Sequence, residues 1–122
     1  MPTRDLTEET FNSTVTDNDI MFIEFWASCC GLCRMFALVY ENVSEVNSDI
    51  VFAKVNTEDH PALAGDFQIS SIPTVMAIRE GVVLYAEPGA LSKKALEDLI
   101  LAVRHVDMDE VRQSLASEEA GE

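Results

Sequence analysis

The segment Ile20–Trp26 constrains the fold of this chain more than any other. Its sequence is Ile-Met-Phe-Ile-Glu-Phe-Trp, so every residue except Glu24 is apolar. An apolar run of this length, without polar alternation, is typical of a central strand that helices cover on both faces of a parallel sheet. The segment therefore predicts an α/β fold and places one carboxyl group, that of Glu24, inside its core.

Helix-like and strand-like patterns alternate along the rest of the chain. We expect further helices at 6–15, 35–47, 61–67 and from 93 onward, and further strands at 50–55, 74–78 and 82–86. Thr7 and Ser92 can cap the first and last of these helices. The alternation favours parallel strands, and Arg79-Glu80-Gly81 predicts a hairpin that adds antiparallel ones. For the second helix we expect one buried stripe, made of Met35, Leu38, Val39, Val43 and Val46.

The chain is strongly acidic, with 8 Lys and Arg against 22 Asp and Glu and a net charge of −14. Such a chain offers no basic surface for a nucleic acid or for an anionic membrane. It has no apolar run of about 18 residues that could cross a membrane, and we recognise no signal peptide at its start. We therefore expect a cytoplasmic protein, in a compartment where thiols stay reduced.

This charge is unevenly distributed along the chain. Residues 107–122 include six acids and one base, a net −5, which leaves −9 for the remainder. With 48% apolar residues, a chain of 122 residues can bury a core of its own. We expect one folded domain over 1–106 and an acidic C-terminal tail over 107–122, in which Asp107 can begin a short helix.

All three cysteines, Cys29, Cys30 and Cys33, fall within five residues, between the central strand and the next helix. This clustering indicates chemistry rather than a disulfide scaffold. At the start of a helix, outward N–H groups and the helix dipole lower the pKa of the Cys30 thiol and favour its thiolate. Cys33 lies one turn further on, where its thiol can attack a mixed disulfide on Cys30 and release it.

Two other interpretations of the Cys30/Cys33 pair are open: an inert reduced pair, or half of a zinc site. Zinc normally requires four ligands. Cys29, His60 and His105 do not supply the usual ligand spacing, so we expect no metal. A redox dithiol is the interpretation we favour.

Several segments around this pair resemble the thioredoxin family, over roughly residues 5–105. They are Phe25-Trp26-Ala27, Cys30-Gly31-Leu32-Cys33, Ile72-Pro73-Thr74, the hairpin at Gly81, and Pro88-Gly89-Ala90-Leu91-Ser92. The resemblance implies a thioredoxin fold, with a central mixed sheet flanked by helices, and a cis bond before Pro73. It implies that the Cys30/Cys33 dithiol reduces protein disulfides. It also implies a substrate-binding surface made of Trp26, Cys29, Gly31, Leu32, Ile72, Pro73, Gly89 and Ala90.

The same resemblance implies the partners of the protein. They are disulfide-containing protein substrates and a separate electron donor of the thioredoxin-reductase type, because the sequence contains no nucleotide-binding or flavin-binding motif. We expect no bound cofactor and a monomeric protein. The net negative charge further predicts partners with a basic or neutral docking face.

The active-site motif departs from the Trp-Cys-Gly-Pro-Cys that is usual in the family. Cys29 stands at the Trp position and Leu32 at the Pro position. Loss of the proline frees a backbone N–H and relaxes the loop, which leaves the redox potential open. Cys29 is either a third redox thiol or a small residue at a variable surface position, and a Cys29–Cys30 bond would be strained. Leu38 replaces a further proline, which predicts a straighter helix.

Glu24 stands where the family usually has Asp. A buried carboxylate without a partner is costly, so Glu24 should be either neutral or paired, and Lys54 in the next strand is the expected partner. In the family such a pair assists proton transfer at the buried cysteine. We favour this catalytic role for Glu24 and Lys54 over that of a purely structural ion pair.

These observations lead to one main hypothesis and two alternatives. The main hypothesis is a thiol–disulfide oxidoreductase that reduces protein disulfides. One alternative is a thioredoxin-like binding module or co-chaperone without turnover, which the intact cysteine pair argues against. The other is a less reducing disulfide oxidase or isomerase, which the changes at Cys29 and Leu32 leave open.

Overall fold

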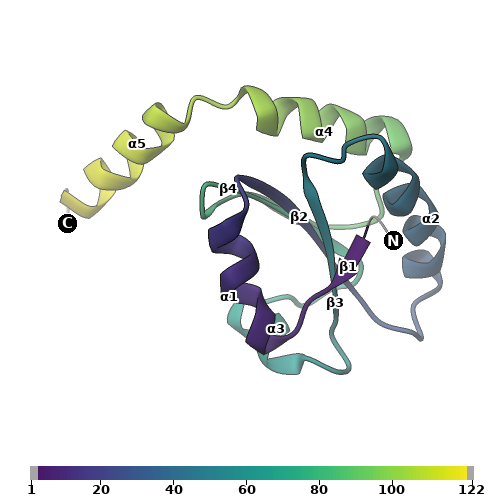
Figure 1. The fold of residues 1–122 in the computed structure, drawn as a ribbon. Coiled ribbons are helices and arrows are strands. Elements are labelled where there is room, and N and C mark those ends of the chain that lie inside the picture. Colours follow the sequence, from purple (N-terminus) through teal and green to yellow (C-terminus); the bar gives the residue numbers. More distant parts are fainter. Residues whose placement is uncertain (1–2, 121–122) are drawn as a thin grey trace.

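The computed structural model describes residues 3–120 and has an α/β fold with ten elements in the order β-α-β-α-β-α-β-β-α-α (Figure 1). In chain order the elements are β1 (Thr3–Asp5), α1 (Glu8–Asp17), β2 (Ile20–Trp26), α2 (Gly31–Glu45), β3 (Val51–Asn56), α3 (Pro61–Asp66), β4 (Thr74–Arg79), β5 (Val82–Pro88), α4 (Lys93–His105) and α5 (Met108–Ala120). The predicted strand Ile20–Trp26 is confirmed without a shift at either end.

The five strands form one mixed sheet in the order β1-β3-β2-β4-β5. The strands β1, β2 and β3 are parallel, whereas β4 is antiparallel to β2 and β5 is antiparallel to β4. The predicted hairpin joins β4 to β5, and Glu80 and Gly81 both adopt positive φ there, as a tight turn of this kind requires. The central position of β2 explains why its sequence is apolar on both sides.

Helices cover both faces of the sheet. On one face, α2 and α4 pack over Ile20, Phe22 and Phe52. On the other face, α1 and α3 pack over Met21, Ile23 and neighbouring apolar residues. Because side chains alternate between the faces of a strand, this division places every second residue of β2 beneath α2.

The expected buried stripe of α2 is wrong in most of its members. Met35, Leu38 and Val46 are 70%, 71% and 73% exposed. The side of α2 that packs on the sheet instead carries Cys33, Phe36, Tyr40, Val43 and Ser44. Of the expected stripe, Val43 is buried and Val39 packs partly against the core. The error arises because α2 has apolar residues on both sides, so periodicity alone does not identify the buried side.

Smaller features of the elements also bear on the predictions. The short strand β1, which was not expected, pairs with β3 at the edge of the sheet through Thr3 and Phe52. The predicted caps are confirmed: the side chain of Thr7 accepts a hydrogen bond from Thr10 N–H, and that of Ser92 accepts one from Ala95 N–H.

The C-terminal segment forms a 13-residue helix, α5, which extends away from the sheet in Figure 1. The Asp107 carboxylate accepts hydrogen bonds from the N–H groups of Asp109 and Glu110, so it caps this helix as expected. Met108 is only 5% exposed, and Arg112 pairs with Glu80 of the β4–β5 turn. The division into a domain over 1–106 and a tail over 107–122 remains a prediction.

No helix in the described part of the chain is both long enough and apolar enough to cross a membrane.

Candidate redox site

Cys30 and Cys33 lie at the start of α2, directly after the loop that follows β2. Cys30 is the N-cap residue, with φ −94° and ψ 111°, and its Sγ accepts a hydrogen bond of 3.1 Å from the N–H of Cys33. The two Sγ atoms are bonded in this structure, and the Cα atoms are 5.2 Å apart. Cys30 is half-buried and Cys33 is 2% exposed, so the first thiol is the more accessible of the two.

The loop before Cys30 is held by hydrogen bonds that sequence reasoning missed. The backbone N–H and the hydroxyl of Ser28 donate to Glu58 Oε1 at 2.9 and 2.7 Å, and Arg34 Nη1 donates to the Ser28 carbonyl at 2.9 Å. The bonds from Ser28 lower the pKa of the Glu58 carboxyl. These contacts fix the segment that leads to Cys29 and Cys30. They restrain the loop before the motif, whereas Leu32 inside the motif lacks the rigidity of a proline. Nothing in the sequence spacing indicated Glu58.

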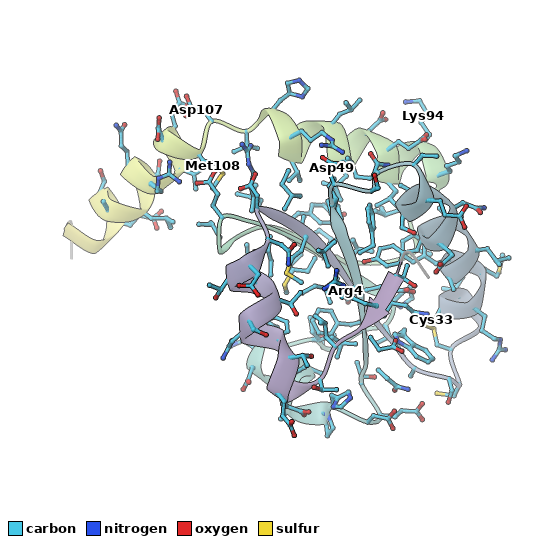
Figure 2. The ribbon with its side chains drawn as sticks, in the orientation of Figure 1. Arg4, Cys33, Asp49, Lys94, Asp107 and Met108 are labelled. Carbon is cyan, nitrogen blue, oxygen red and sulfur yellow. A yellow bond between two sulfur atoms is a disulfide. The ribbon has the colours of Figure 1, made fainter. Side chains whose placement is uncertain are left out.

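A pocket of about 250 Å³ lies beneath α2. Three of the four predicted catalytic residues line it: Glu24, Lys54 and Cys33. It is lined by Glu24, Trp26, Cys33, Arg34, Ala37 and Lys54. The strand pattern explains the grouping, because Glu24 and Trp26 share a face of β2 with Phe22, and Lys54 shares a face of β3 with Phe52. Figure 2 shows Cys33 at the end of α2 where the loop enters the helix.

Glu24 has the most perturbed carboxyl group near the cysteines. Its side chain is 0% exposed, and neither carboxylate oxygen has a hydrogen-bond partner within the described part of the chain. Burial raises the pKa of Glu24 to about 7, and the nearby positive charge of Lys54 offsets only part of this rise. A proton can therefore leave or join this group near neutral pH.

The expected direct pairing of Glu24 with Lys54 does not form. The two residues are register partners across β2 and β3, and their side chains share a face of the sheet. However, Lys54 Nζ lies over Trp26, 5.0 Å from the centroid of the indole ring, in a cation–π contact. Of the two expected states, neutral or paired, Glu24 therefore adopts the neutral one, with a carboxyl group that is largely protonated below pH 7.

Tyr40 is a further buried polar residue of α2 that sequence reasoning missed. Its hydroxyl donates to the Ala53 carbonyl at 2.7 Å, and its ring packs edge-on against Phe52. Burial raises the pKa of Tyr40 well above its usual value, and the charge of Glu24 raises it further. Tyr40 is thus a neutral phenol on the inner side of α2, seven residues after Cys33, and this spacing was the signal that could have identified it.

The predicted substrate residues from the second half of the chain lie near the C-terminal end of β2, in the middle of the sheet. Phe25 pairs with Thr74, which places Pro73 beside the end of β2. The Ile72–Pro73 bond is cis, as the resemblance implies, and the Gly89 N–H donates to the Pro73 carbonyl at 2.8 Å. Pro73 is buried and Ile72 half-buried, whereas Gly89 and Ala90 are exposed.

The remaining predicted residues lie around the first cysteine. Cys29 is exposed and is not part of a disulfide. Leu32 is 57% exposed, and Gly31 is also exposed. The described residues contain no cluster of three or more His, Cys, Asp or Glu side chains that could hold a metal ion.

Comparisons with known proteins agree with this geometry. Residues 2–102 match the family model named Thioredoxin. The chain is 52% identical to "Putative thioredoxin 2" of Streptomyces coelicolor over 118 residues, which cover 97% of this chain and 88% of that protein. It is 36% identical to thioredoxin 1 of Synechococcus elongatus over 97 residues, which cover 78% and 91% of the two chains.

Solved structures confirm the predicted thioredoxin fold. A point mutant of a thioredoxin from Halobacterium salinarum superposes with a TM-score of 0.79 at 25% identity, over 87% of this chain and 95% of the other. A thioredoxin of Plasmodium falciparum superposes with a TM-score of 0.76 at 28% identity, over 82% and 98%. Thioredoxins in general act on disulfide substrates and are reduced by thioredoxin reductase. With its cysteine pair at disulfide distance, the chain belongs to the thioredoxin family of protein-disulfide oxidoreductases.

Proposed function

We propose that this protein reduces disulfides of partner proteins, with Cys30 as the nucleophile and Cys33 as the resolving thiol. The observation that carries the proposal is the position of Cys30 at the N-cap of α2, where its Sγ accepts the N–H of Cys33. The same N–H group and the helix dipole would stabilise a Cys30 thiolate once the disulfide is reduced. The deeper burial of Cys33 reserves that thiol for the second step.

In the first step, the Cys30 thiolate attacks one sulfur of the substrate disulfide, and the other sulfur leaves as a thiolate. In the second step, Cys33 attacks Cys30 in this mixed disulfide. The Cys30–Cys33 disulfide forms, and the first substrate sulfur is released as a thiolate. Two electrons have then passed from the dithiol to the substrate.

Glu24 takes up the proton that Cys33 loses in the second step. Support comes from the pocket that both residues line, from the absence of hydrogen bonds to the Glu24 oxygens among the described residues, and from the pKa of about 7. A carboxyl group with this pKa is suited to accept and return a proton at neutral pH. Lys54 limits the rise of the Glu24 pKa, so that the carboxylate remains accessible.

The substrate chain binds across the edge of the sheet next to Cys30. Ile72, Pro73, Gly89 and Ala90 form one side of this surface. Trp26, Cys29, Gly31 and Leu32 form the other. The substrates are disulfide-containing proteins with a basic or neutral docking face, because the chain carries a net charge of −14.

A thioredoxin-reductase-type enzyme regenerates the dithiol, and the protein acts as a cytoplasmic monomer. These assignments follow from family membership and from the sequence. Cys29 and Leu32 alter the surroundings of Cys30, so a redox titration of the wild type and of Cys29→Ser decides how reducing the pair is. A potential well above that of a reducing thioredoxin would favour the oxidase or isomerase alternative.

The direct test of the proposal uses pre-reduced protein and a model disulfide protein such as insulin. We expect the wild type to reduce insulin and Cys30→Ser to lose this activity, whereas Cys29→Ser retains most of it. Undiminished activity in Cys30→Ser would contradict the proposal. A wild type that binds the disulfide protein without reducing it would favour the binding module.

A further inference from the structure

The side of α2 that faces away from the sheet carries an unusual number of exposed apolar side chains. Leu32, Met35, Leu38 and Val46 are 57%, 70%, 71% and 73% exposed. Across the described residues, seven large apolar side chains are exposed, and four of them belong to this one helix and its C-cap. We call these four residues the outer strip. Isolated exposed apolar residues are normal, but a contiguous group marks an interaction surface.

The outer strip is continuous along the helix. Leu32, Met35 and Leu38 are spaced three apart, which makes each a surface neighbour of the next. Leu38 connects to Val46 through the uncharged Asn42, and these three residues are spaced four apart. At the usual rise per residue, the strip is about 21 Å long. Among the described residues, no helix or strand lies on the side of α2 that faces away from the sheet in Figure 1.

At its far end the outer strip meets α4. Val46 lines a pocket of about 400 Å³ together with Leu101, which is itself 54% exposed. Glu97 and Asp98 line the same pocket. The lining of this pocket is therefore partly apolar and carries two acidic side chains and one basic one, that of Arg104.

At its near end the outer strip begins inside the redox motif. Leu32 lies between Cys30 and Cys33, so a protein whose disulfide reaches Cys30 comes close to the first turn of α2. The strip is thus continuous with the place where substrates react. The strip runs along α2, whereas Ile72 and Pro73 precede β4 and Gly89 follows β5.

Charges beside the outer strip indicate what kind of surface would fit it. Glu45 and Glu97 form no ion pair within the described part of the chain, whereas Asp98 is paired with Lys94. Arg104, which also lines the far pocket, is paired with Asp49. The charges left unpaired near the far end are therefore negative, in a protein with a net charge of −14. A complementary partner combines apolar side chains with Lys or Arg.

We propose that the outer strip is a second docking surface, which binds an apolar and basic segment next to the disulfide of a protein substrate. The proposal rests on the disulfide-exchange function of Cys30 and adds to it a preference among substrates. Burial of two or three apolar side chains of the substrate against Met35 and Leu38 supplies the binding energy. The carboxylates of Glu45 and Glu97, near Val46 and Leu101, select positive charge.

The test uses synthetic peptides that contain the same small disulfide loop and differ only in an eight-residue tail. One tail alternates Leu with Lys, a second alternates Leu with Glu, and a third alternates Gly with Ser. Each tail is attached on either side of the loop, because the orientation of the bound segment is not assumed. The measured quantity is the second-order rate constant for reduction by the pre-reduced protein, expressed as a ratio to the Gly/Ser peptide.

For the wild type we expect the better Leu/Lys peptide to react at least about tenfold faster than its Gly/Ser counterpart. The Leu/Glu peptide should gain less. In the double variant Met35→Gln/Leu38→Gln this ratio should fall to about one, because both exposed sites lose their apolar contact area while Gln keeps the helix propensity. The matched control is Leu115→Gln, which changes an exposed leucine of α5 and should leave the ratio as in the wild type.

The outcomes separate this proposal from the proposed function. A ratio near one in the wild type, or a high ratio that survives in the double variant, would overturn the docking surface while reduction of the Gly/Ser peptide upheld the disulfide exchange. A Leu/Glu tail that works as well as Leu/Lys would overturn the charge preference. If the wild type reduces none of the peptides, the function itself fails.

Discussion

The two sides of α2 have similar apolar content but opposite environments. On the inner side, Phe36, Tyr40 and Val43 are almost fully buried against the sheet. On the outer side, Met35 and Leu38 are more than two-thirds exposed. The comparison shows that apolar side chains on one helix can serve two purposes. The inner ones stabilise the fold beneath Cys33, and the outer ones remain available to a partner.

The largest difference between the two sides should appear in stability. We expect Phe36→Ala to lower the free energy of unfolding by about 3–5 kcal/mol, because it leaves a cavity in the core. Leu38→Ala on the outer side should change it by no more than about 0.5 kcal/mol. Urea denaturation at neutral pH measures both. Similar losses at the two positions would show that the outer side is covered in solution, for instance by a second copy of the chain.

The inner side of α2 also faces a titratable group, the buried carboxyl of Glu24. Its pKa of about 7 in the folded chain exceeds the ordinary value of 4.5, so the folded chain retains this proton where the unfolded chain has lost it. The resulting stability is fully present below pH 4.5 and is lost as the pH rises through 7. The total is about 3 kcal/mol. We expect this pH-dependent loss in wild type and not in Glu24→Gln, as measured by denaturation at a series of pH values.

The same variant tests the proton transfer. Release of substrate from the mixed disulfide should speed up as the pH rises, with a midpoint of about 7. The reason is that Glu24 can accept the Cys33 proton only in its ionised form. In Glu24→Gln this step should be slower by about 100-fold or more and should lose that midpoint. An unchanged pH profile would make Glu24 a structural residue only.

Tyr40 provides the smallest of the expected effects. Tyr40→Phe retains the buried ring but removes the hydrogen bond to the Ala53 carbonyl. We expect a loss of about 1 kcal/mol in the free energy of unfolding. Conversion of an outer residue to a polar one, as in Met35→Gln, should cost less than that. If Tyr40→Phe left the free energy of unfolding unchanged, the hydroxyl would make no net contribution to stability.

Sequence reasoning succeeded where one physical cause dominates. The apolar run of β2 has no solvated face, so its burial on both faces and its parallel pairing with β3 could be predicted. The position of Cys30 and Cys33 at a helix start could be predicted from the change of pattern between β2 and α2. The caps at Thr7 and Ser92 depend on local hydrogen bonds, which the sequence specifies directly.

The failures have physical reasons as well. The buried side of α2 depends on what the helix packs against, and its apolar residues fit either side. The strand β1 has only three residues, half-buried or exposed, and exists because β3 offers a free edge. The Lys54 side chain contacts the Trp26 ring rather than the Glu24 carboxylate, and Glu58 binds Ser28 from another loop. Which partner such a side chain contacts depends on distances in the folded structure, and the spacing of residues in the sequence does not specify these distances.

In the proposed mechanism, the accessible thiol at the N-cap of α2 attacks the substrate, and the buried thiol of Cys33 only resolves the mixed disulfide. To separate the two roles, pre-reduced Cys33→Ser is mixed with a peptide disulfide, and mass spectrometry locates the mixed disulfide. We expect a stable adduct on Cys30. An adduct that forms on Cys29 instead, or no adduct although the wild type reduces the peptide, would contradict it.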